Sequence, residues 1–287
     1  MKQKLPVFFH VPKNAGTYVT DWLLVGFRQY RRTKTNWLQN YTPEKDSIKT
    51  IQILREDFIV ARCLVGDPNY ILDAANSLTK LDKNNFKIDI KEIYQLNEFF
   101  VFAVIVEARG FKIKDQILEN FKQYDLKQFL ILRDCFGRNQ SEFHYIQSQA
   151  SKHELSHKAF GDMCFEEYIL SDYFPDSWLI RNLLDVKDTE PITQKLFDQA
   201  CSLLKETFKV YDIKQTDKAI SDILIECYQI DPKDIQLKNW DCIAKNENQY
   251  KKIKLEDLPL STQKTFNEKT YWDQNLYNIL CQNQKHQ

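Results

Sequence analysis

The chain has 287 residues, and its 40 Lys and Arg are balanced by 40 Asp and Glu, so the formal net charge is zero at pH 7. This length can bury one large core. The balanced charge does not indicate the broad basic surface used to bind nucleic acid. No apolar run approaches the ~20 residues that cross a bilayer, and the start, MKQKLPVFFHVPK, is broken too often to be a signal peptide. We therefore expect a cytoplasmic protein without a membrane span.

Residues 5–24 predict a strand, a tight turn and a helix in succession. An apolar run ending at Val11 is typical of a strand buried on both faces of a parallel sheet, and Pro12 ends it. Apolar residues then return at helical spacing, with Val19 and Leu23 one turn apart. A helix that begins in this turn points its first N–H groups and the positive end of its dipole toward the turn, beside Lys13. The turn is therefore expected to bind phosphate or sulfate.

Further apolar runs predict strands over 57–68, 99–106, 127–134 and 210–213, and helical spacing predicts helices over 112–124, 192–208 and 216–228. This alternation is typical of an α/β protein with a parallel sheet. Glu107 and Arg109 follow the strand 99–106 directly, where such sheets bind ligands. A salt bridge from Glu107 to Arg109 or to another partner is an alternative interpretation. The seven scattered cysteines contain no C-x-x-C pair, so we expect reduced thiols rather than disulfides or structural zinc.

The string FFHVPKNAGTYV closely resembles the 5′-phosphosulfate-binding loop of sulfotransferases, in particular of the carbohydrate type. It is not a Walker A loop, because its lysine precedes the glycine. Asn14 stands where Thr or Ser is usual, and Tyr18 stands where a small hydroxyl residue is usual. The resemblance implies that the 5′-phosphosulfate is held by Lys13, Asn14, Ala15, Gly16, Thr17 and Tyr18.

A second string, LILRDCFGRNQSEFHYI, resembles the 3′-phosphate-binding element of the same family. Arg133 closes the strand, and Ser141 lies eight residues further on, in the following helix. The resemblance implies that the Arg133 guanidinium and the Ser141 hydroxyl hold one phosphate, the guanidinium with its bidentate fork. Cys135 replaces the usual proline.

Together the two strings imply a P-loop-like three-layer α/β/α fold with a central parallel sheet. The fold would be a single sulfotransferase-like domain over 1–287, with variable insertions near 35–98 and 229–265. The co-substrate implied is 3′-phosphoadenosine 5′-phosphosulfate, without a metal, and the reaction is sulfuryl transfer to an acceptor hydroxyl, with a saccharide favoured. Lys13 would neutralise the bridging oxygen, Glu107 is the candidate general base by position, and Arg109 is a candidate substrate-binding residue. The acceptor and the oligomeric state are not predicted.

Two alternatives stay open. His153, Glu154 and His157 spell H-E-x-x-H, the signature of zinc metalloproteases, although their flanks, QSQASK and KAFGD, are polar rather than apolar. The Gly-His pair of several carbohydrate sulfotransferases is absent, which leaves a non-catalytic nucleotide-binding scaffold as the other alternative.

Overall fold

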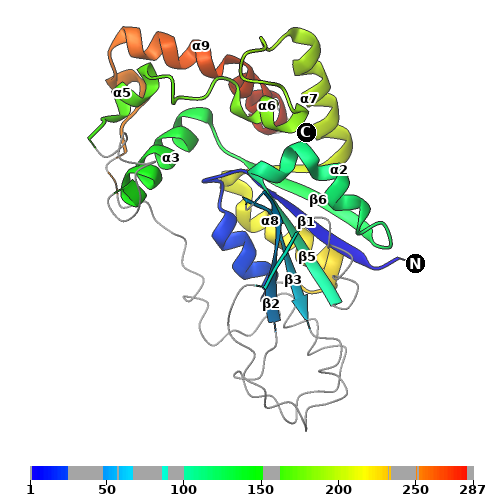
Figure 1. Ribbon diagram of the computed structural model, residues 1–287. Coiled ribbons are helices and arrows are strands. Elements are labelled where there is room, and N and C mark those ends of the chain that lie inside the picture. Colours follow the sequence, from blue (N-terminus) through cyan, green and yellow to red (C-terminus); the bar gives the residue numbers. More distant parts are fainter. Residues whose placement is uncertain are drawn as a thin grey trace. The chain divides into compact units, whose positions relative to one another are not determined.

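The computed structural model describes residues 2–24, 48–56, 58–66, 86–89, 100–150, 162–231, 233, 250 and 252–282 (Figure 1). The chain divides into two compact units. The first unit consists of Met1–His10, Gly16–Leu130 and Lys214–Ala244, and the second unit consists of Val11–Ala15, Ile131–Ile213 and Lys245–Gln287. The expected single domain over 1–287 stays a prediction.

The sheet of the first unit is mixed, with its strands in the order β4-β2-β3-β5-β1-β6. β1 runs parallel to both β5 and β6, and β2 runs parallel to β4. β3 runs antiparallel to both of its neighbours. The strands are β1 (Lys4–His10), β2 (Ile48–Arg55), β3 (Phe58–Gly66), β4 (Phe86–Asp89), β5 (Phe100–Glu107) and β6 (Asp125–Leu132), of which the last two residues count with the second unit.

The α/β class and the strands expected over 57–68, 99–106 and 127–134 are confirmed. The expected central parallel sheet is a mostly parallel, mixed sheet, because β3 is reversed. β2 ends at Arg55 and β3 begins at Phe58, and strands so close in the sequence can pair only as an antiparallel hairpin. The sequence analysis expected residues 35–98 to be an insertion and did not predict β2 or β4.

Side chains of β1 alternate between the two faces of this sheet. Phe8 stacks on Phe129 of β6, with ring centroids 5.1 Å apart. Phe9 points the other way and contacts Phe111, at 5.4 Å, in the 3-10 helix η5 (Ala108–Ile113). On the Phe129 side, helix 16–24 lies beside α8 (Thr216–Ile223), as Figure 1 shows in blue and yellow. Helical segments therefore cover both faces.

Two further helices of the first unit depart in detail from expectation. The helix expected over 112–124 is η5 followed by α2 (Lys114–Glu119). The helix expected over 216–228 is confirmed, with its last turn in the wider π form, η8 (Leu224–Tyr228). Gly110 allows η5 to lie directly on β3, because a Cβ there would come within 2.1 Å of the Val60 carbonyl oxygen.

The second unit is mainly helical and has an aromatic core. Phe143 of α3 (Cys135–Ala150) packs against Phe165 and Tyr168 of α5 (Phe165–Leu170). Phe266 of α9 (Leu260–Tyr277) belongs to the same buried cluster. The strand and helix expected over 210–213 and 192–208 are confirmed as β7 and α7. The remaining elements of this unit are α6 (Trp178–Leu184), α7 (Gln194–Thr207), β7 (Lys209–Asp212), η11 (Leu255–Asp257) and η12 (Asn278–Gln282), and η7 (Ile213–Gln215) begins in it and continues into the first unit.

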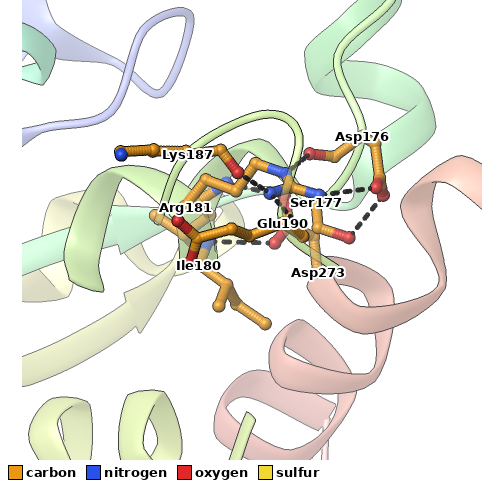
Figure 2. Close-up of polar contacts among 8 residues, drawn as sticks. Asp176, Ser177, Ile180, Arg181, Lys187, Glu190 and Asp273 are labelled. Carbon is orange, nitrogen blue, oxygen red and sulfur yellow. Dashed lines mark hydrogen bonds and ion pairs between the residues drawn. The ribbon is translucent and has the colours of Figure 1, made fainter. Parts of the chain in front are cut away.

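A buried arginine organises the loops around α6 (Figure 2). The Arg181 side chain is 5% exposed. It donates hydrogen bonds to the backbone carbonyls of Asp176, Lys187 and Glu190 and forms an ion pair with the Asp176 carboxylate at 2.9 Å. These contacts hold both connections of α6, so Arg181 has a structural role.

Asp273 of α9 caps the same helix (Figure 2). Its carboxylate accepts hydrogen bonds from the backbone N–H groups of Leu179 at 2.8 Å and Ile180 at 3.2 Å. Carboxylates stabilise helix N-termini in this way. Asp273 therefore joins α9 to α6.

Candidate functional site

The turn expected to bind an anion belongs to the second unit as Val11–Ala15. The Asn14 backbone N–H donates to the Val11 carbonyl at 3.2 Å and closes the turn. Lys13 and Ala15 both have left-handed backbones, with φ of 65° and 60°. An alternation of left- and right-handed residues turns successive N–H groups toward one concave side, the backbone geometry of many anion sites.

Asn14 ties this turn to the end of β6. Its side chain is 1% exposed, and Nδ2 donates to the Ile131 carbonyl at 2.8 Å. One amide hydrogen is therefore used within the protein, and the second remains for other contacts. Within the described part of the chain, Asn14 Oδ1 is buried without a hydrogen-bond partner. Because Arg133 follows Ile131 by two residues, this bond brings Lys13 and Arg133 into one region.

Lys13 occupies a partly buried, charged environment. Its Nζ lies 4.2 Å from the ring centroid of Tyr145 on α3, a cation–π distance. Burial lowers the pKa of Lys13, and the like charge of Arg133 lowers it further. The Glu142 carboxylate raises it, but the pKa remains below its usual value. An anion placed between the ammonium and guanidinium groups would remove the repulsion between them.

Arg133 lies against the first turn of α3. A Cβ at Gly137 would come within 2.7 Å of Arg133 Nε and 2.9 Å of Asp134 Oδ2, so the glycine makes room for both side chains. The Asp134 carboxylate accepts from the Gly137 N–H at 2.7 Å, and Gln274 Oε1 accepts from the Cys135 N–H at 3.2 Å. Because these helix N–H groups are already bonded, the guanidinium rather than the helix end would hold a phosphate here.

Ser141 and Arg138 are placed less favourably for ligand binding. Ser141 lies within α3 and is only 3% exposed. Arg138 is also buried; it forms an ion pair with Glu142 at 3.2 Å and lies 4.6 Å from the Trp178 ring. Arg138 therefore supports the packing of α3, whereas a Ser141 contact with a ligand would need neighbouring side chains to move.

Gly16, Thr17 and Tyr18 begin helix 16–24 and belong to the first unit. Thr17 is exposed. The Tyr18 hydroxyl donates to Asp217 Oδ1 of α8 at 2.9 Å. Tyr18 thus joins its helix to α8, a role that accounts for a tyrosine where the family resemblance expects a small residue.

Glu107 belongs to a strand-end cluster in the first unit, formed by His10, Glu107 and Arg62. His10 and Glu107 face each other across β1 and β5, with Nδ1 and Oε2 2.8 Å apart. Arg62 of β3 donates from Nε to Glu107 Oε1 at 2.5 Å. Burial raises the pKa of Glu107, but the hydrogen bonds and charges of His10 and Arg62 outweigh it and lower that pKa. Glu107 is therefore a stabilised carboxylate and a weak proton acceptor.

Arg109 contacts an aromatic ring, whereas Glu107 contacts His10 and Arg62. Its guanidinium lies 4.0 Å from the ring centroid of Phe58, an exposed aromatic residue at the start of β3. Of the two sequence interpretations of Glu107, the structure therefore supports an ion pair with another partner. The partners, His10 and Arg62, were not predicted, although His10 is visible as the last residue of the first strand.

The zinc-protease residues His153, Glu154 and His157 lie outside the described residues. Among the residues that the structure describes, no group of three or more His, Cys, Asp or Glu could hold a metal ion. No helix in the described ranges is long and apolar enough to cross a membrane. Six of the seven cysteines are described, and these are free thiols as expected.

Comparison of the chain with models of known protein families, with curated proteins and with solved structures gives no match in any of the three.

Proposed function

We propose that the protein is a sulfotransferase that moves a sulfuryl group from 3′-phosphoadenosine 5′-phosphosulfate to an acceptor hydroxyl, with a saccharide as the acceptor class. The proposal includes the three-layer, P-loop-like α/β/α fold of that family. Two observations support the proposal. The two sequence strings resemble the family's phosphate-binding elements, and the strands that precede them, β1 and β6, are parallel neighbours in a mixed sheet.

One observation carries the proposal. The Asn14 side chain donates a hydrogen bond that ties the lysine turn to Ile131, two residues before Arg133. The two strings are 120 residues apart when counted from Lys13 to Arg133, and an ordinary surface lysine and arginine would have no reason to meet. Two cations held together repel each other, and a ligand with two phosphate-bearing ends compensates both.

In the proposed reaction Lys13 neutralises the charge that develops on the bridging oxygen as the bond to sulfur breaks. Arg133 holds the 3′-phosphate, with Ser141 beside it once α3 side chains make room. Sulfuryl transfer resembles phosphoryl transfer in needing positioning and charge stabilisation above all. The left-handed turn contributes backbone N–H groups, and Thr17 contributes an exposed hydroxyl.

The test measures binding of two nucleotides, 3′,5′-bisphosphoadenosine and 5′-AMP, by calorimetry. The wild type should prefer the bisphosphate. Arg133→Ala should remove that preference, because the guanidinium contacts the 3′-phosphate alone, whereas Lys13→Ala should weaken both nucleotides. Lys122→Ala, which removes an exposed lysine paired with Glu119, is the matched control and should change neither. A wild type that binds neither nucleotide would refute the proposal.

A further inference from the structure

Helix α9 of the second unit has one face in the aromatic core and an opposite face toward solvent; Figure 1 shows the helix in orange. On the solvent side Leu260 is 82% exposed and Tyr271 is 54% exposed. A shallow groove of about 660 Å³ follows this side, and we call the residues that line it the α9 face. They are Leu260, Gln263, Lys264, Asn267, Glu268, Tyr271 and Trp272. Exposed apolar side chains surrounded by polar ones are typical of an interaction site.

Four residues of the α9 face lie in one line along the helix. Leu260, Lys264, Asn267 and Tyr271 are separated by four, three and four positions, the spacing that keeps side chains on one side of an α-helix. The line is about 17 Å long at about 1.5 Å per residue. Glu268 lies beside it, one turn after Lys264. The line thus has an apolar or aromatic residue at each end and polar or charged residues in the middle.

We infer that the α9 face binds the α9 face of a second copy of the chain, with the two helices antiparallel. This inference goes beyond the proposed function and does not depend on it. If the pair is centred between Thr265 and Phe266, Leu260 of each copy lies level with Tyr271 of the other. The leucine can then cover the tyrosine ring at both ends of the contact. A two-fold axis makes every contact occur twice, which closes the pair as a dimer.

The charges of the α9 face favour this partner. Lys264 and Glu268 are exposed, and their Nζ and Oε1 atoms are 3.8 Å apart within the helix. In the antiparallel pair Lys264 of each copy lies within one residue's rise of Glu268 of the other, on the same side of the contact. Two equivalent ion pairs can therefore form between the helices, as in coiled coils. A parallel pair would instead bring Lys264 to Lys264 and Glu268 to Glu268.

The aromatic end of the α9 face is held in place within the second unit. Trp272 contacts Phe197 of α7, with ring centroids 5.3 Å apart, and Tyr271 lies edge-on to Trp272 at 5.0 Å. A ring that is fixed before binding loses little conformational freedom when a partner covers it. A single pair of helices buries less than a standard interface of about 1,600 Å². The dimer should therefore be reversible and should form as the protein concentration rises.

The first experiment measures the oligomeric state of the full chain by sedimentation velocity at increasing protein concentration. The wild type should pass from monomer to dimer. Leu260→Ser and Tyr271→Ser should each raise the dissociation constant about tenfold or more, because each removes an apolar contact twice. Since Leu260 is on the surface, Leu260→Ser should keep the wild-type circular dichroism. A wild type that stays monomeric at every concentration would overturn the inference, whichever other protein or saccharide the α9 face then binds.

The second experiment tests the antiparallel pairing by exchanging charges at low salt, where surface charges are least screened. Lys264→Glu and Glu268→Lys should each dimerise more weakly than the wild type, because like charges then meet twice across the contact. A mixture of the two variants should form a heterodimer about as tightly as the wild type dimerises, since both ion pairs are restored, one with its charges exchanged. A mixture that associates no better than the separate variants would overturn the inference. So would a mixture that binds more tightly than the wild type, the result expected of a parallel pair.

Lys122→Glu is the matched control, because Lys122 is an exposed lysine of the first unit that pairs with Glu119 at 2.6 Å, as Lys264 pairs with Glu268. The same charge reversal there should leave the dissociation constant of the dimer unchanged. An equal loss of dimer in Lys122→Glu and Lys264→Glu would show that net charge, and not the α9 face, controls association, and would overturn the inference.

Discussion

Gly16→Ala is the most direct test of the contact between the strand-end cluster and helix 16–24. Gly16 does not have a positive φ, and it begins a helix, where Ala is favoured over Gly by about 1 kcal/mol. On backbone grounds alone the substitution should therefore stabilise the protein. The added methyl group, however, would lie 2.0 Å from His10 Nε2, and Glu107 holds that imidazole in place.

The expected magnitude follows from these two opposing effects. Forcing a methyl group into occupied space costs about 1–3 kcal/mol, which offsets the helix preference. We expect a net loss of up to about 2 kcal/mol in the wild-type background. In a His10→Ala background the space is empty, so Gly16→Ala should stabilise by about 1 kcal/mol.

The assay is a double-mutant cycle measured by urea unfolding, with tryptophan fluorescence as the signal, since Trp22 is buried in the same helix. Gly110→Ala is the control, because its Cβ would meet the Val60 carbonyl and Val106 Cγ1 rather than His10, and His10→Ala should not relieve it. An equal effect of Gly16→Ala in both backgrounds would show that His10 does not lie on Gly16.

Three further predictions concern stability. The pKa of Glu107 is lowered in the folded protein, so the ionised carboxylate stabilises the fold near neutral pH, and this stabilisation is lost as pH falls through the folded pKa. Glu107→Gln should therefore lower the free energy of unfolding at pH 7 and lower it less in acid, as measured by urea unfolding at both pH values. Asp273→Ala leaves two N–H groups of α6 without their acceptor and should cost about 1–3 kcal/mol, and Asp273→Asn should cost less, by thermal unfolding. Asn14→Ala should cost about 1–2 kcal/mol and weaken bisphosphate binding in calorimetry, because the lysine turn loses its bond to Ile131; unchanged affinity would contradict that link.

Much of the strand pattern could be predicted because buried strands have an almost continuous apolar sequence. β5 contains FVFAVIV, which no amphipathic helix would use, and β6 ends in FLIL. β2 reads IKTIQILR, with polar residues between the apolar ones. So short an alternating segment does not by itself indicate a strand rather than an insertion. Without β2 the hairpin between β2 and β3 cannot be predicted, and the reversed direction of β3 follows from that hairpin.

The sequence predicts which strand ends carry the candidate site but not which side chains meet there. Lys13 and Arg133 each follow an apolar run, and parallel strands bring such positions to one edge of a sheet. The pairing of His10 with Glu107 depends on the register between β1 and β5. Both strands are buried on both faces and no hairpin joins them, so neither an alternating pattern nor a turn sets this register. The same holds for Tyr145, which contacts Lys13 only because of how α3 packs.

The reversed direction of β3 has a further consequence for the edge of the sheet where β1 and β5 end. Ala61 faces Val106 in the sheet, so the beginning of β3, and not its end, lies where β1 and β5 finish. Phe58, under the Arg109 guanidinium, is the first residue of that beginning. The hairpin that joins β2 to β3 at Glu56 therefore lies at the edge of the sheet where β1 and β5 end, and its length or sequence can change while the parallel strands keep their packing.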